Sequence, residues 1–351
     1  MKMRHFLLLV IVLILFSTVT FGEKLATLEG LSKPGSLAVD PYYPQFYVTE
    51  EATIFIYSLA DFKLKTKFGK AGEGPQEFHI MQGTNSLVVQ PLKDSLLINS
   101  MRRVSFFSKE GKFIKELSTG AGFMSMWFQP IGNGYAGLDM ALDGDTQSMA
   151  FTLNLYDGQF NKTKQIQKMN LAQRGKMQFP MVAPIFYAAD EKIIALGGED
   201  FAIDVYNSGG NKLTSISREY KKIEVTEEYK KGVHDFYKSS PNFGQFYESI
   251  KNMFQFSNYF PAIQTFLAAD QKIYIQTYLK EEGGYEFFIY DLEGKFLKRL
   301  FLPVVYRNSL MPFPYTIMHN KLYQLIENEA AEVWELHAVA IDSSQPTRKS
   351  E

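Results

Sequence analysis

The chain has 351 residues, of which 46% are hydrophobic and 15% aromatic, and it contains no cysteine. The absence of cysteine excludes disulfides, cysteine catalysis and cysteine-ligated metals, so its stability must come from burial. With 37 basic and 38 acidic side chains, the balanced charge gives no support to nucleic-acid binding or to adhesion to anionic lipid.

The N-terminus has the order of a secretory signal. Lys2 and Arg4 precede an uninterrupted apolar run over 6–16, and small or polar residues then lead to Glu23. Because a bilayer span needs about 20 apolar residues, we expect residues 1–22 to be a cleaved signal peptide rather than an anchor. The sequence therefore predicts a periplasmic or secreted protein that has no membrane attachment after cleavage.

A β segment that ends in an aromatic residue recurs along the rest of the chain. The aromatic markers are Tyr57, Phe107, Tyr156, Tyr206 and Tyr290, and a weaker copy lies at 333–339. Subtraction of these numbers gives separations of 50, 49, 50 and 84. Three nearly equal steps indicate a structural repeat, and the long step equals one period plus an insertion of about 34 residues.

Each marker lies third in a group of four short strands that are separated by Gly, Asn and Asp turns. In the second copy, for example, the strands read SLVVQP, SLLINS, VSFFS and FIKELS. No helical crossovers separate these strands, so the pattern favours a radial all-β repeat over a parallel sheet. We expect a six-bladed β-propeller of four-stranded blades over residues 23–340, followed by a flexible tail at 341–351.

The sixth copy lacks its fourth strand. The segment KLATLEGL, at 24–31, is a β segment without another assignment, and it can supply that strand from the opposite end of the chain. Such closure hides the last open sheet edge.

The segment FGKAGEGPQEF, at 68–78, resembles the G-x-G-P-x-E-F connector of NHL-type six-bladed propellers, and the strand spacing resembles that of exported bacterial propellers. The resemblance implies the same fold and a bacterial origin. Gly69, Gly72 and Gly74 permit tight turns, and Phe78 can wedge between blades. A phosphate-binding loop is disfavoured, because no Lys-Ser or Lys-Thr pair follows.

The insertion, at 218–258 between blades four and five, has helical periodicity. Thr226 is a plausible N-cap of a first helix, and an apolar stripe after Pro241 indicates a second one. Propeller topology places this insertion on the face that carries the hairpins between second and third strands, near the central channel. Its aromatic residues are either packing against blades four and five or forming a lid over a ligand site. The candidate ligand-binding residues here are Phe236, Phe243, Phe246 and Tyr247.

The hairpins on this same face are mostly acidic, with Arg102 and Arg103 as the exception that could grip a carboxylate. Polarity at hairpin tips is also simply ordinary. Asp143 and Asp145 resemble a fragment of a calcium loop without its later ligands, so calcium is at most a weak candidate there and we assign no metal site and no cofactor. Neither a metal-ligand spacing of histidines nor a nucleophile motif is present, so we assign no catalytic residue.

Two functions follow as the main hypotheses, and a structural scaffold role is the third. The first is a monomeric extracytoplasmic binding protein for a protein, peptide or glycan at the channel face. The alternative is a metal-dependent hydrolase or lyase that resembles the lactonase-type and amidating-lyase propellers, with its site in the central channel. It requires acidic, Asn or His side chains that converge on the channel from several blades.

Overall fold

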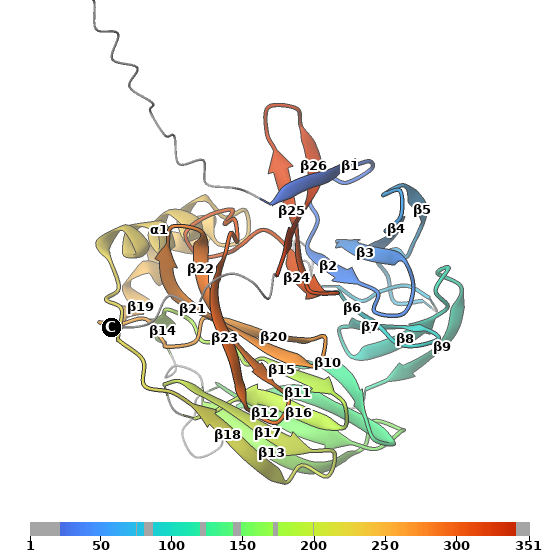
Figure 1. Cartoon of the computed structure of the whole chain (residues 1–351), viewed down its shortest axis with the longest axis horizontal. Helices are drawn as coiled ribbons and strands as arrows, with labels where there is room; N and C mark the ends of the chain where they lie inside the picture. Colours follow the sequence, from blue (N-terminus) through green and yellow to red (C-terminus); the bar gives the residue numbers. More distant parts are fainter. Residues whose placement is uncertain are drawn as a thin grey trace, which may run out of the picture.

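The computed structural model describes residues 22–74, 76–80, 87–119, 124–142, 149–170, 175–198 and 200–341. It confirms the predicted all-β fold, because six four-stranded antiparallel sheets form a closed ring of blades (Figure 1). The signal peptide, apart from its last residue, and the tail beyond Ile341 lie outside the described residues. So do Asp143 and Asp145 of the calcium-loop fragment.

Within a blade the strands follow one another in chain order. Blade one contains β2 (Ser36–Val39), β3 (Gln45–Glu50), β4 (Thr53–Ser58) and β5 (Leu64–Phe68). Blade two contains β6 (Val88–Pro91), β7 (Leu96–Ser100), β8 (Arg103–Phe107) and β9 (Phe113–Ser118). Blade three contains β10 (Met124–Ile131), β11 (Gly134–Leu142), β12 (Met149–Tyr156) and β13 (Lys162–Asn170).

Blade four contains β15 (Phe186–Ala189), β16 (Lys192–Leu196), β17 (Ala202–Asn207) and β18 (Lys212–Ser217). Blade five contains β20 (Thr265–Ala269), β21 (Lys272–Glu281), β22 (Gly284–Asp291) and β23 (Phe296–Leu302). Blade six contains β24 (Tyr315–Met318), β25 (Lys321–Asn328), β26 (Val333–Ala340) and β1 (Glu23–Leu28). First strands contact one another between neighbouring blades, except that β10 of blade three contacts the second strand β7 of blade two, so the first strands surround the axis.

Middle strands are buried on both faces by the neighbouring blades, and for that reason they read as continuous apolar runs. The strand β4, with the sequence TIFIYS, is buried at all four of its central residues, whereas the outermost strand β5 is largely exposed. In blade four, a two-residue hairpin joins the first and second strands through Asp190 and Glu191, both of which have positive φ. This is the backbone geometry of a type I′ turn, whose twist matches that of the strands.

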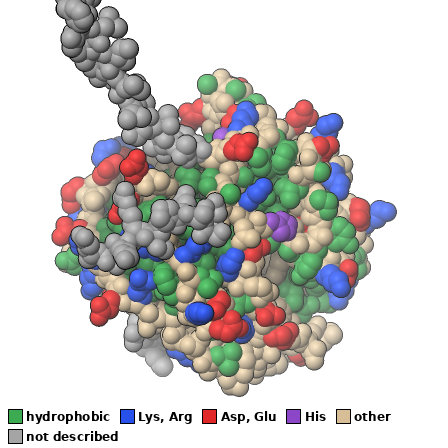
Figure 2. All heavy atoms as spheres, in the orientation of Figure 1, with side chains coloured by type: hydrophobic (Ala, Val, Ile, Leu, Met, Phe, Trp, Pro, Cys, Tyr) green, Lys and Arg blue, Asp and Glu red, His purple; other side chains and the backbone are tan. Residues whose placement is uncertain are grey.

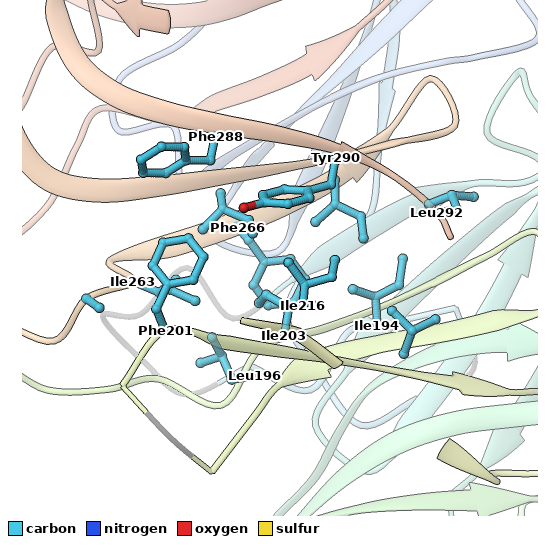
Figure 3. Packing of buried hydrophobic residues seen from close by; sticks show 14 residues of the cluster. Ile194, Leu196, Phe201, Ile203, Ile216, Ile263, Phe266, Phe288, Tyr290 and Leu292 are labelled. Carbon is cyan, nitrogen blue, oxygen red and sulfur yellow. The ribbon is translucent and has the colours of Figure 1, made fainter. Parts of the chain in front are cut away.

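The blades are joined by apolar side chains that interdigitate between adjacent sheets. Between blades four and five, Ile194 and Ile203 lie opposite Phe266, and all three side chains are fully buried (Figure 3). The Phe201 and Phe288 rings meet edge to face with their centroids 5.6 Å apart. Each fully buried side chain of this size contributes about 1.5–3 kcal/mol.

The glycine-rich connector performs the structural role predicted for it. Phe78 is fully buried between blades one and two, and its ring lies 5.8 Å from that of Phe107. Gly69 has a φ of +95°, and a Cβ added there would lie 2.5 Å from the Phe78 ring and 2.6 Å from the Ala52 carbonyl oxygen. A side chain at this position would therefore displace the wedge.

The N-terminal strand β1 closes the ring, as predicted. It pairs antiparallel with β26 and brings Leu28 opposite Trp334, and both side chains are buried. Lys24 Nζ lies 2.6 Å from Glu335 Oε1, and the Glu335 carboxylate also accepts a hydrogen bond from Asn328. His337 contacts both this carboxylate and the Gly22 carbonyl oxygen. Residues more than 300 positions apart thus complete blade six.

The helical insertion follows β18. Its first helix, α1 (Glu227–Ser239), begins at the predicted cap, where Thr226 Oγ1 accepts a hydrogen bond from the Tyr229 backbone N–H. The second predicted helix is broken into η1 (Gly244–Phe246), α2 (Tyr247–Ile250) and η2 (Lys251–Met253), which lead into β19 (Phe254–Phe256). Within the described part of the chain, no helix is both long and apolar enough to cross a membrane.

The carboxylate at the closure makes stability dependent on pH. Hydrogen bonds from Lys24 and Asn328 lower the Glu335 pKa from its ordinary value of 4.5 to about 2. Because the folded pKa is depressed, the stabilisation is complete above the unfolded value and is lost as the pH falls from about 4.5 towards 2. We expect Glu335→Gln to lower the free energy of unfolding by about 1–2 kcal/mol at neutral pH.

Urea unfolding between pH 7 and pH 3 measures this effect. The difference in unfolding free energy between the wild type and the Glu335→Gln variant should become smaller as the pH falls through the acidic range. Glu329→Gln, an exposed change in the same blade, serves as the matched control and should remain close to wild type throughout. If the difference in unfolding free energy stays constant with pH, the Glu335 carboxylate is not the group that makes stability depend on pH.

Candidate functional site

Three consecutive links between blades meet on one face of the ring. They run from β13 to β15, from β18 to β20 and from β23 to β24, and each joins the outermost strand of one blade to the innermost strand of the next. In an antiparallel meander these links emerge at the same end of the blades as the hairpins between second and third strands. This face therefore carries all the additional structure around blades four to six.

The first two links share a small parallel sheet that the sequence patterns did not predict. β14 (Met177–Phe179) pairs with β19, so that Phe179 lies opposite Phe256. Phe179 is 2% exposed, and its ring contacts those of Tyr237, Phe254 and Phe256 at centroid distances of 5.7, 5.1 and 5.7 Å. The insertion therefore has a hydrophobic core of its own, centred on a residue from another link.

The third link packs against the same core. Leu310 contacts the cluster of Phe179, Val233 and Tyr237. Gly232, in the middle of α1, lies so close to Ser309 that a Cβ on this glycine would be only 2.4 Å from the Ser309 Oγ. The three links thus form one unit, which we call the cap: residues 175–185, 218–264 and 303–314.

The four aromatic residues predicted to bind ligand all lie in the cap. Phe236 and Tyr247 are partly buried in its core, and the Tyr247 hydroxyl lies 3.0 Å from His234 Nδ1. Phe243 and Phe246 remain 44% and 54% exposed. Packing therefore accounts for the first pair, whereas the second pair presents apolar rings to solvent.

The predicted arginine pair lies in blade two, away from the cap in the ring (Figure 1). Arg103 donates hydrogen bonds to the backbone carbonyl oxygens of Glu73 and Gly74, at 2.7 and 3.2 Å, and lies 3.4 Å from the Glu116 carboxylate. It holds the glycine-rich connector in place. Arg102 is exposed at the hairpin tip, where its φ is +60°.

On the same face as the cap, tyrosine and glutamine side chains form a hydrogen-bonded network. The hydroxyl of Tyr315 donates to Gln276 Oε1 at 2.6 Å, and Gln276 Nε2 donates to Gln264 Oε1 at 3.0 Å and to the Tyr306 hydroxyl at 3.2 Å. Tyr315 begins the inner strand β24, and Gln276 lies opposite the first residue of β20, so the network is at the end where the links enter.

Two further tyrosines belong to this group, which we call the tyrosine recess: Tyr187, Gln264, Gln276, Tyr278, Tyr306 and Tyr315. Tyr187 lies on the inner strand β15, and Tyr278 stacks on Phe260 with ring centroids 4.3 Å apart. Phe260 in turn meets Tyr229 of α1 edge to face at 4.9 Å. The cap therefore contacts the recess directly.

The tyrosines of the recess are neutral. Burial raises the pKa of Tyr187, Tyr278, Tyr306 and Tyr315 well above the usual value for a phenol. The largest electrostatic contributions to the pKa values of Tyr278, Tyr306 and Tyr315 come from other tyrosines. All four side chains nevertheless remain partly accessible to solvent.

Charged side chains are spread over the surface. On the face shown in Figure 2, acidic and basic side chains are interspersed around the edge and also occur nearer the centre. At the end of the blades opposite the cap, a buried ion pair joins Lys109 Nζ in blade two to Asp40 Oδ2 in blade one at 2.7 Å. Asp40 also accepts hydrogen bonds from the Tyr47 hydroxyl and from the backbone N–H groups of Tyr42 and Tyr43, so this pair fastens two blades together.

Two other kinds of site, a metal centre and an enclosed cavity, were also considered. Among the described residues, no group of three or more His, Asp or Glu side chains could hold a metal ion. A cavity of about 20 Å³ between blades three and four, bordered by Leu153, Gln167 and Phe186, has room for a single water molecule. Within these limits, the cap and the recess beneath it are the candidate site.

Similarity to known proteins was assessed against families, curated proteins and solved structures. No family model and no curated protein matches the chain. An exported protein from Bacteroides fragilis NCTC 9343 shares 12% identity, with a TM-score of 0.51 over 90% of this chain and 93% of that chain. The shared feature is the fold alone.

Two further solved structures are less similar. BamB from Moraxella catarrhalis has 12% identity and a TM-score of 0.34 over 84% of this chain and 70% of that chain. A luciferin-regenerating enzyme has 10% identity and a TM-score of 0.47 over 91% of this chain and 94% of that chain. The propeller thus has structural counterparts, while the assignment to the NHL type stays a prediction.

The recess was not identified from the sequence. Its residues come from two inner strands, one middle strand and two links, and strand periodicity carries no information about which links meet. The available signal was the tyrosine placed close to the start of an inner strand in APIFY, at 183–187, and in PFPY, at 312–315. A strand that only packs between blades has no need of a hydroxyl there.

The contact between α1 and the third link can be tested at Gly232. Gly232→Ala favours the helix by about 1 kcal/mol but drives a methyl group into Ser309. We expect faster hydrogen exchange in the 303–314 link while α1 stays protected.

Two control variants isolate this contact. Ser309→Gly alone measures the effect of glycine on the flexibility of the link. Adding Gly232→Ala to that variant should cause no further increase in exchange, because the clash has been removed. Wild-type exchange in the single Gly232→Ala variant would show that the link does not rest on the helix.

Proposed function

We propose that this chain is an extracytoplasmic binding protein that recognises its ligand on the capped face of the propeller. The observation that carries the proposal is the union of three links into one cap. Links that serve only to connect blades are short, whereas these share a core of their own and leave Phe243 and Phe246 exposed.

The physical chemistry of binding sites supports this location. Ligand sites combine aromatic contact area with a few fixed polar groups, and the capped face offers both. Exposed Phe243 and Phe246 provide apolar area, and the hydrogen-bonded Gln276 holds the polar groups of the recess in position. The acidic side chains that the sequence places on the hairpins of this face are not needed for this function.

Export is part of the same proposal. The first 22 residues have the order of a cleavable signal. The similarity to an exported Bacteroides fragilis protein and the resemblance of the 68–78 connector to NHL-type propellers both agree with an exported bacterial propeller. We expect the mature chain to begin at Glu23.

Because the chain has no cysteine, a single introduced cysteine can be modified without competing reactions. We would attach a long polyethylene glycol chain through the Phe246→Cys variant, which blocks the capped face. The control is the Tyr42→Cys variant, at a side chain 60% exposed in the β2–β3 hairpin, which lies at the opposite end of the blades.

Both conjugates and the unmodified mature chain would be immobilised and exposed to an extracytoplasmic extract of the source organism. We expect the same molecule to be retained by the unmodified chain and by the Tyr42→Cys conjugate, and to be lost from the Phe246→Cys conjugate. Equal retention by the two conjugates, or no specific retention by the unmodified chain, would overturn the proposal.

A further inference from the structure

The tyrosine recess has hydrogen-bonding capacity that its internal network leaves unused. Among the described residues, the hydroxyls of Tyr187 and Tyr278 have no hydrogen-bond partner. In the described part of the chain, the Tyr306 oxygen accepts from Gln276 while its O–H donates to no partner, and Gln264 uses its side-chain oxygen but not its amide N–H groups. Each hydroxyl can both donate and accept.

These free groups are also held in place. Gln276 is fully buried, and its three hydrogen bonds connect residues from blade five, blade six and both adjoining links. Tyr278 is stacked on Phe260, and Tyr187 meets Phe266 edge to face at 5.4 Å. Side chains that are already immobilised lose little entropy when a ligand binds.

The surroundings favour an uncharged ligand. An ion that enters a recess of neutral tyrosines and amides would lose hydration without meeting an opposite charge, which is unfavourable. The hydrogen-bonding groups of the recess are phenol hydroxyls and amides, and the largest electrostatic influences on Tyr278, Tyr306 and Tyr315 come from other tyrosines. These groups give an ion no opposite charge in return for its hydration.

Peptide recognition commonly uses an added β-strand, deep apolar pockets or charged clusters. The recess offers instead several hydroxyl and amide groups beside aromatic rings. A sugar matches this arrangement, because its hydroxyls both donate and accept and its C–H faces can pack on aromatic rings.

We propose that the tyrosine recess binds an uncharged glycan. This inference rests on the proposed function and specifies the ligand class for the same face. The hydroxyls of Tyr187, Tyr278 and Tyr306 and the amide of Gln264 would contact the sugar hydroxyls, while the cap would cover the bound chain.

The first test is an array that carries neutral, anionic and cationic glycans together with neutral peptides, probed with the mature protein. We expect binding to neutral glycans. Titration calorimetry with the best neutral oligosaccharide should then give an affinity that falls by about three- to tenfold in each of Tyr187→Phe and Tyr278→Phe, since each loses one hydrogen bond.

Tyr42→Phe is the matched control, because it removes an exposed hydroxyl at the opposite end of the blades and should leave the affinity unchanged. Circular dichroism should show that all three variants are folded. The proposal is overturned by binding to no glycan, by binding to charged glycans alone, by unchanged affinity in both recess variants, or by recess-dependent binding of a neutral peptide.

This outcome can be separated from that of the binding proposal. If no glycan binds but blocking at position 246 still removes a ligand captured from the extract, the capped face is a binding site for another class of molecule. If neither experiment detects binding, the function proposed above is itself wrong.

Discussion

The structure depends on the pairing of every sheet edge around a closed ring. A propeller with one blade short of a strand would leave a row of unpaired backbone groups and an exposed apolar surface. Here β1 supplies the missing strand. Leu28 pairs with Trp334 in the core of blade six, and Lys24 forms an ion pair with Glu335, so the two ends of the chain are held together. Each blade is then buried between two neighbours.

Closure also determines where specialised structure can arise. A four-stranded meander returns each link to the same face, so additions to neighbouring links are brought together without any change in the blades. The pairing of β14 with β19 and the packing of Leu310 on the cluster of Phe179, Val233 and Tyr237 show how three links become one cap. In the ring, the hydrogen bond from the Tyr315 hydroxyl to Gln276 Oε1 joins blade six to blade five at the end where the links enter.

The sequence predicted what the repeat controls. The markers Tyr57, Phe107 and Tyr206 all lie in third strands, because a fifty-residue period reflects a requirement shared by every blade. The cap could not be predicted in the same way: β14 and β19 are three residues long and meet across an entire blade. The role of Arg103 was equally hidden, since a hairpin arginine that binds backbone carbonyl oxygens looks the same in sequence as one that faces solvent.

The most direct test of this account compares the thermal unfolding of a protein that starts at Glu23 with that of one that starts at Ser32. If β1 completes the ring, the shorter protein should unfold at a lower temperature, and hydrogen exchange should increase in β26, whose outer edge becomes unpaired. Equal unfolding temperatures and unchanged exchange in β26 would contradict closure by the N-terminal strand.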